Sequence, residues 1–140
     1  MGLVELQLPR NAAYVGLARS IVTAGARLDG MAEGRLEDLK IAVSEAAAYA
    51  ISATADGGPL LLAFGVHDDA FEVHVLGPLL SAAEGLGEWP AVGGMGLRLI
   101  EGLADEVRFP EESRSQLVLR FAMADLGGVA GVSAASRPAG

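Results

Sequence analysis

The sequence predicts an α+β fold, a two-layer sandwich in which helices cover one face of a mixed β-sheet. Three observations lead to this fold class. Several short segments alternate between apolar and polar residues, as half-buried strands do, and others carry apolar residues at helical spacing. The segments follow one another as β-α-α-β-β, then a long loop, then α-β-β. The 140 residues fit one domain, which we place at 1–124, followed by a Gly/Ala/Ser-rich tail at 125–140 that we expect to be flexible.

The N-terminal half supplies one strand and two helices. Val4–Leu8 alternates at period two and predicts a strand, which Pro9 closes. Asn11 is a plausible cap for a helix that we expect to run to about residue 24, with Gly25 beginning a break. The strongest helical pattern spans 36 to about 52, with acidic residues in its first turn, where the helix dipole favours them. Its apolar stripe, which predicts the core-facing side, consists of Leu36, Leu39, Val43, Ala46 and Ala50.

The C-terminal half supplies four strands and one helix. An apolar strand is expected at 60–66 and an alternating one at 71–75, joined by a polar hairpin. On the second of these strands, Glu72 and His74 fall opposite the apolar positions, which predicts that they lie on a solvated face. Residues 79–92 show no sustained period and are expected to form a long loop or lid. The pattern is completed by a helix from 97 and by strands at 106–109 and 115–123.

The composition argues against several classes of function. A net charge of −8 disfavours binding to nucleic acid or to an anionic membrane surface, and it suits a protein partner with a basic patch. The chain has no cysteine and only two histidines, which leaves little for a zinc site or a nucleophilic hydrolase. Neither a signal-peptide pattern nor an apolar run of membrane-spanning length is found, so we expect a cytoplasmic protein.

Glu45 is the first candidate for a chemical role. It lies in the segment 41–51, which has almost no other polar side chain. A carboxylate there either reaches solvent past the alanines, as an exposed helix residue, or lines a cavity. In a cavity, desolvation would raise its pKa toward the range of a base that activates a hydroxyl group or water. Tyr49, one turn later, lies on the same face, where packing is a more common role for a tyrosine than chemistry at its hydroxyl.

The second candidate is the glycine-rich segment before the last predicted helix. Gly93, Gly94 and Gly96 fall within four residues, and Leu97 begins the apolar stripe of the helix. Glycine at such positions indicates positive φ or a close approach of the backbone. Unpaired N–H groups at the helix start would then favour an anion such as phosphate. The alternative is a flexible glycine loop that only leads into a core helix.

The two motifs together, at 38–46 and 93–101, resemble the anti-sigma factor serine kinases, which belong to the histidine kinase/Hsp90-like (GHKL, Bergerat-fold) ATPases. The resemblance covers about residues 3 to 124, including the order of the elements. It implies a helix glutamate that activates the attacking hydroxyl, an Asn one turn later that holds Mg²⁺, and an Asp after the middle hairpin that recognises adenine. It also implies a G-x-G-L loop over the phosphates of ATP. Carried onto this chain, the resemblance assigns catalysis to Glu45 and nucleotide binding to Gly93, Gly94, Gly96 and Leu97.

Two positions depart from the pattern of that family. Tyr49 stands where the magnesium-holding Asn is expected, and Gly77 stands where the adenine-reading Asp is expected. A neutral phenol is a poor ligand for a hard cation, so no metal-binding residue is assigned. An adenine amine left without its acceptor costs about 1–3 kcal/mol. Both changes weaken the expected use of ATP and Mg²⁺ as cofactors.

Two functions follow from the resemblance. The first, which the replaced positions favour, is an anti-sigma-factor-like regulatory protein that binds a sigma factor or an antagonist protein, with nucleotide binding weakened or lost. The alternative is an active ATP-dependent serine/threonine kinase of an anti-sigma factor antagonist. A third is a sensory domain whose altered pocket holds another small ligand. The resemblance also implies a homodimer, and we expect neither nucleic acid nor a membrane as a partner.

Overall fold

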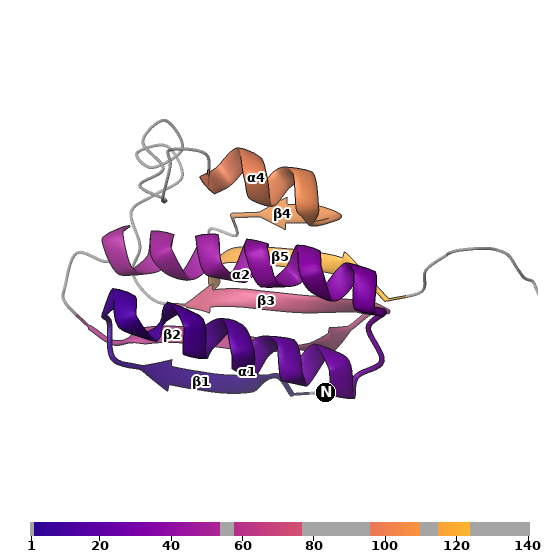
Figure 1. The fold of residues 1–140 in the computed structure, drawn as a ribbon, viewed down its shortest axis with the longest axis horizontal. Helices are drawn as coiled ribbons and strands as arrows, with labels where there is room; N and C mark the ends of the chain where they lie inside the picture. The colour runs from indigo at the N-terminus through magenta and orange to yellow at the C-terminus, as the bar shows by residue number, and fades with distance from the viewer. Residues whose placement is uncertain (1, 54–57, 77–95, 110–114, 124–140) are drawn as a thin grey trace, which may run out of the picture.

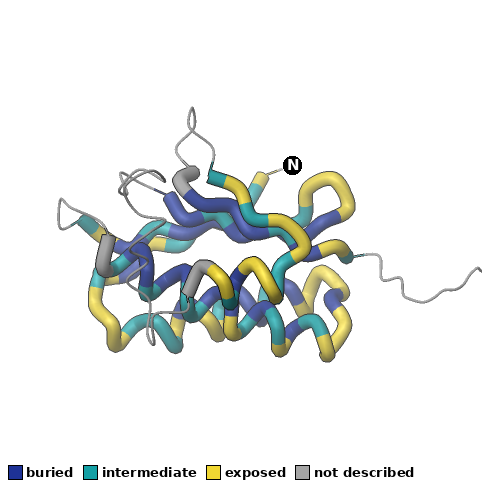
Figure 2. Tube along the Cα trace, turned by 90° about the horizontal axis from the view of Figure 1, so that it is seen from above, coloured by how far each residue is buried: buried dark blue, intermediate teal, exposed yellow. Residues whose placement is uncertain are grey.

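The protein has two layers, a β-sheet and a set of helices that cover one of its faces (Figure 1). After a 90° turn from that view, the layers lie one above the other, with buried residues concentrated between them (Figure 2). This arrangement confirms the predicted α+β sandwich. The computed structural model describes residues 2–53, 58–76, 96–109 and 115–123, and the predicted loop at 79–92 and tail at 125–140 lie outside these ranges.

The helical layer consists of α1 (Val15–Leu28), α2 (Glu33–Ala53) and α4 (Gly96–Leu103), with a short 3₁₀ turn, η1 (Ala12–Tyr14), before α1. Asn11 caps η1, because its Oδ1 accepts a hydrogen bond from the backbone N–H of Ala13 at 2.8 Å. The helix α1 continues through Gly25, where the sequence predicts a break. A Cβ at Gly25 would lie 2.4 Å from Cε1 of Phe64, so this glycine permits close packing of α1 on the sheet. None of the described helices combines the length and hydrophobicity that a membrane span requires.

The sheet is antiparallel throughout its described pairings, with the strand order β1-β2-β3-β5-β4. Its strands are β1 (Val4–Leu8), β2 (Leu60–His67), β3 (Ala70–Leu76), β4 (Glu106–Arg108) and β5 (Ser115–Ala122). It is therefore not the mixed sheet that the sequence suggests. The strands β3 and β4 run in the same direction, but β5 lies between these two strands and pairs antiparallel with both.

The polar hairpin connection that the sequence predicts is a tight turn between β2 and β3. Asp68 and Asp69 both have positive φ, at 52° and 63°. Two successive residues in this conformation make the type of two-residue turn whose twist matches that of antiparallel strands. The turn fixes the register of the hairpin, in which His67 lies opposite Ala70.

The core between the layers contains the predicted apolar stripe of α2. Every residue of that stripe is at most 3% exposed. Phe71 on β3 and Phe121 on β5 are fully buried on the facing side of the sheet. Alanines at positions 42, 46, 47 and 50 of α2 are buried, so this part of the helix packs closely in the core, and this contact fixes which residues of α2 point outward.

The far face of the sheet differs from the prediction at Glu72 and His74. Glu72 is only 3% exposed, and its carboxylate Oε1 lies 2.7 Å from Nε2 of His74. Arg120, which is the register partner of Glu72 on β5, donates a hydrogen bond to the other carboxylate oxygen. The expected solvated face is wrong here because β3 is an interior strand, and a long side chain from its neighbour covers the carboxylate.

Candidate functional site

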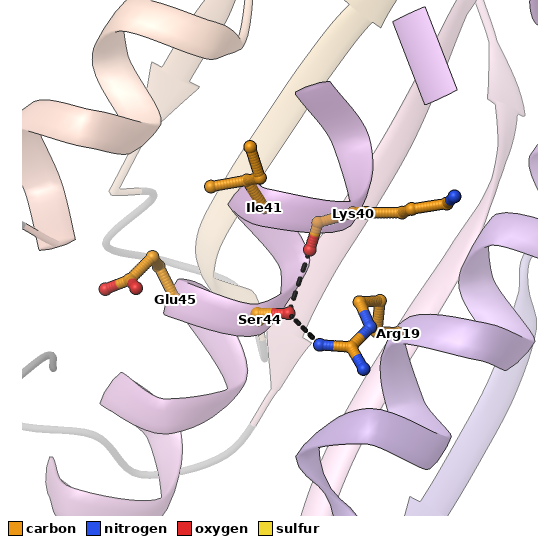
Figure 3. A pocket seen from close by; sticks show the side chains of 5 residues that line it. All are labelled: Arg19, Lys40, Ile41, Ser44 and Glu45. Carbon is orange, nitrogen blue, oxygen red and sulfur yellow. Dashed lines mark hydrogen bonds between the residues drawn. The ribbon is translucent and has the colours of Figure 1, made fainter. Parts of the chain in front are cut away.

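Glu45 lies in the middle of α2, on the outer side of the helix. Its side chain is partly buried, and burial raises its pKa above 4.5. The Oε1 atom is shielded from solvent and receives no hydrogen bond from any described residue. The structure lies between the two alternatives for this glutamate, because Glu45 is only partly buried and lines an open surface hollow of about 330 Å³ (Figure 3).

The hollow lies between α1 and α2 and is lined by five residues from these helices: Arg19, Lys40, Ile41, Ser44 and Glu45. Arg19 reaches from α1 to α2, where its Nη1 donates a hydrogen bond to Ser44 Oγ at 3.1 Å. The Ser44 hydroxyl in turn donates to the carbonyl oxygen of Lys40, one turn earlier, at 2.9 Å. Figure 3 shows this chain of hydrogen bonds on one side of α2 and the Glu45 carboxylate pointing away from it on the other side.

Tyr49 is part of the hydrophobic core. It is 1% exposed and is among the largest side chains that the structure buries completely. Burial raises the pKa of its phenol, which therefore stays neutral at physiological pH. A neutral phenol inside the core does not fit a magnesium ion, whose ligands are carboxylates, carboxamides, carbonyls and water. Elsewhere in the described ranges, no group of three acidic, histidine or cysteine side chains is placed to hold a metal.

The glycine-rich segment leads into α4, as the sequence predicts. Gly96 is the first residue of α4 and Leu97 the second, whereas Gly93, Gly94 and Gly77 lie outside the described residues. The roles of these five residues in nucleotide binding therefore stay predictions. Ile100, one turn into α4, is fully buried and anchors the helix in the core.

Arg35 sets the position of α4 relative to α2. From the first turn of α2, its Nη1 donates to the carbonyl oxygen of Leu103 at 3.2 Å, and its Nη2 lies 2.7 Å from the carboxylate of Asp105. Its guanidinium also lies over the ring of Phe121, 5.2 Å from the centroid. The C-terminal end of α4 is thus held at the start of α2. From there α4 extends back along α2 (Figure 1).

Sequence analysis identifies Glu45 but misses the basic side of the hollow. Lys40 and Ser44 are one turn apart on α2, a spacing that places them on the same helix face. Nothing in the sequence links them to Arg19, which is 25 residues away from Ser44 along the chain. Only the packing of α1 against α2 brings these groups together.

The profile of the histidine kinase-like ATPase domain matches residues 8–123 of this chain. The chain therefore belongs to the histidine kinase-like ATPase family, whose two-layer fold it has.

Within this family, its relatives include serine-protein kinases. The serine-protein kinase RsbW of Bacillus subtilis (strain 168) is 34% identical over 130 residues, which cover 79% of each chain. The protein of the same name from Listeria innocua is 32% identical over 137 residues, covering 84% of this chain and 86% of the relative. That of Bacillus licheniformis is 34% identical over 126 residues, covering 79% of each chain.

Proposed function

We propose that this protein is an anti-sigma-factor-like regulator, which binds a sigma factor or an antagonist protein and in which nucleotide binding is weakened or lost. Membership of the family and the similarity to serine-protein kinases named RsbW support the regulatory role. We expect it to act in the cytoplasm as a homodimer, without nucleic acid or a membrane as a partner. Sedimentation of a monomer at micromolar concentration would contradict the dimer.

The burial of Tyr49 is the observation that carries the loss of nucleotide binding. The resemblance to the anti-sigma factor serine kinases implies a magnesium-holding Asn at this position. Here a neutral aromatic side chain, 1% exposed, packs into the core instead. Phosphoryl transfer depends on positioning and on neutralising phosphate charge, and a metal supplies much of both. A chain without a metal ligand at this point is better suited to binding a protein than to transferring phosphate.

A second candidate, an ATP-dependent serine/threonine kinase of an antagonist protein, is favoured by Glu45. Its raised pKa and its Oε1 atom, which no described residue hydrogen-bonds, suit a base that accepts the proton of an attacking hydroxyl. The hollow beside it leaves room for a ligand. These features account only for removal of the proton from the attacking hydroxyl. They do not supply the contacts to a metal and to adenine that the kinase reaction also needs.

Thermal unfolding with magnesium and ATP distinguishes the two candidates. A ligand present at one hundred times its Kd adds about 2.7 kcal/mol to the free energy of unfolding, which raises Tm by several degrees. We expect no such rise with millimolar ATP, and no difference from GTP as the control. A rise of several degrees with ATP alone would contradict weakened nucleotide binding.

Two further measurements test the regulatory role itself. Titration calorimetry with the sigma factors and the antagonist proteins encoded in the same genome should find at least one complex, and failure with all of them would contradict the proposal. The kinase alternative requires transfer of labelled phosphate to such an antagonist, abolished by Glu45→Ala.

A further inference from the structure

The two ends of α4 are attached to the rest of the protein in different ways. At the C-terminal end, Arg35 of α2 donates to the carbonyl oxygen of Leu103 and pairs with the carboxylate of Asp105. The backbone N–H of Ala122 on β5 donates to that carboxylate at 2.7 Å, and the N–H of Asp105 donates to the carbonyl oxygen of Arg120 at 2.8 Å. These contacts, which we call the Arg35 clamp, bind the end of α4 to both layers of the protein.

The earlier part of α4 has fewer attachments. Ile100 is fully buried there, whereas Leu99 is only partly buried. Arg98 and Glu101 are exposed, and neither side chain forms a hydrogen bond or an ion pair with another described residue. An isolated helix of eight residues is not stable in water, so this part of α4 stays folded mainly through the packing of Ile100.

Gly102 lies between these two attachments. Its backbone is helical, without the positive φ that favours glycine, and a Cβ at this position would have no atom within 4 Å. Neither a turn nor close packing therefore requires a glycine here, in contrast to Gly25. Glycine weakens a helix because it loses more backbone freedom on folding than any other residue. The helix is thus weakened at Gly102, directly before the Arg35 clamp.

We propose that α4 is an arm that opens from α2 about a hinge at Gly102, while the Arg35 clamp keeps its C-terminal end in place. Opening exposes Ile100 to solvent and leaves the sheet and the other helices folded, as local unfolding does in other proteins. Gly96 and Leu97, the described part of the glycine-rich segment, are the first residues of the arm. Each opening therefore carries them away from α2, along which the closed arm lies (Figure 1).

The arm is a conformational device that goes beyond the proposed function and does not depend on it. A ligand or partner that contacts the start of α4 binds the open and the closed arm with different affinities, and it shifts the equilibrium between them by that difference. The alternative is a rigid α4, which the clamp and Ile100 hold in one position until the whole domain unfolds. The two differ in how α4 exchanges its amide hydrogens, with no ligand or partner present.

Hydrogen exchange of the unchanged chain at increasing urea concentration, followed by NMR, tests the arm. We expect the amides of Ile100, Glu101 and Gly102 to exchange through a local opening that low urea hardly affects. The amides of Asp105 and Ala122, which form hydrogen bonds in the clamp, should be at least tenfold better protected and exchange only through global unfolding. Equal protection of the two groups, with the same dependence on urea, would overturn the arm.

A single thiol gives an independent measurement, because the chain contains no cysteine. Ile100→Cys places a thiol under the arm, and Val22→Cys places one at an equally buried position of α1. Each labelling rate by a thiol reagent is divided by the unfolded fraction of the same variant, taken from its urea titration. The corrected rate of Ile100→Cys should be at least tenfold higher, and equal corrected rates would favour the rigid α4.

The variant Gly102→Ala locates the hinge. Alanine fits this position without a clash and should slow the exchange of the α4 amides about two- to fivefold. Gly16→Ala is the matched control, since Gly16 is the second residue of α1 and a Cβ there meets only the end of the Arg19 side chain, at 3.4 Å. The control should leave exchange in α4 unchanged. Equal effects of the two variants on α4 would mean that Gly102 is not the hinge.

The variant Arg35→Ala tests the clamp. The amides of Asp105 and Ala122 should lose at least tenfold in protection and then exchange together with those of α4. Arg27→Ala removes an exposed, ion-paired arginine outside the clamp and should leave all of these amides unchanged. If Arg35→Ala does not fold, Arg35→Lys serves in its place, because lysine keeps the charge but lacks the forked donors and should give a smaller loss. Unchanged protection of Asp105 and Ala122 would overturn the role of the clamp.

Discussion

Two glutamates, one in each layer of the protein, have pKa values that are shifted in opposite directions. Glu72 on β3 is 3% exposed, whereas Glu45 on α2 is only partly buried. The more deeply buried carboxylate nevertheless has its pKa held below 4.5, and the less buried one has its pKa raised above 4.5. Depth of burial therefore does not decide the charge state of these side chains; their hydrogen-bond partners do.

The partners of Glu72 explain its lowered pKa. Burial acts to raise the pKa, but the hydrogen bond and charge of His74, followed by those of Arg120, outweigh it. Arg108 on β4 adds a more distant positive charge, 3.9 Å from the carboxylate. Glu106 lies 3.0 Å from Arg108 and 3.4 Å from Arg120, so the charges form a network across three strands. Glu45 has no comparable partner among the described residues, and desolvation alone acts on it.

The largest expected effect is that of removing the Glu72 carboxylate. Glu72→Ala removes the buried carboxylate that both Arg120 and His74 contact, which should lower the free energy of unfolding by about 3–5 kcal/mol. Glu45→Ala, the matched control on the other layer, should change it by under about 1 kcal/mol, because no described residue loses a partner. Urea unfolding of both variants measures the difference. Equal losses would mean that the contrast between the two sites is wrong.

The pH dependence of stability should have opposite signs for the two carboxylates. The folded-state pKa of Glu72 lies below 4.5, so this residue stabilises the protein above about pH 4.5 and stops doing so as the pH falls through that folded value. The folded-state pKa of Glu45 lies above 4.5, so ionising it costs stability as the pH rises from about 4.5 through its own folded value.

Two amide variants make this prediction measurable. The deficit of Glu72→Gln relative to the unchanged chain should shrink as the pH falls below about 4.5. Glu45→Gln should gain stability relative to the unchanged chain as the pH rises above about 4.5. Urea midpoints from about pH 3 to pH 7 give both curves, and parallel profiles for the two variants would contradict the assignment.

The smallest expected effect concerns the edge of the Glu72 network. Arg108 is 47% exposed, so its contacts with Glu72 and Glu106 are screened by solvent. Arg108→Ala should lower the free energy of unfolding by only about 0–1 kcal/mol. The same urea titration would contradict this if Arg108→Ala lowered the free energy of unfolding as much as Glu72→Ala. The ion pairs on the edge strand β4 would then contribute as much to stability as the buried Glu72 carboxylate.

Much of the fold could be predicted from local pattern. The stripe of α2 and the limits of β1 follow directly from the spacing of apolar residues, which a helix or strand turns into one buried face. The helix after the glycine-rich segment begins at Gly96, at the point that segment indicates. The break predicted at Gly25 is wrong, because the sequence does not show that Phe64 packs against this glycine of α1.

The candidate site could be predicted only in part. Glu45 is conspicuous as the acidic residue in an apolar segment, and Tyr49 as the residue that replaces an expected Asn. The basic side of the hollow could not be found this way, because Arg19 meets Ser44 through the contact of two helices. The burial of Glu72 was missed for the same reason, since its covering residue, Arg120, lies 48 positions later in the chain.

The sequence by itself determined the elements and their order, since these depend on residue spacing within one segment. The tertiary structure alone decided the antiparallel sheet, the opposite pKa shifts of the two glutamates and the hollow between α1 and α2. Each of these features depends on which side chains, far apart in the sequence, lie close together in the folded protein. Charge and hydrogen bonding act over a few ångströms of space, and the chain brings residues into that range only when it folds.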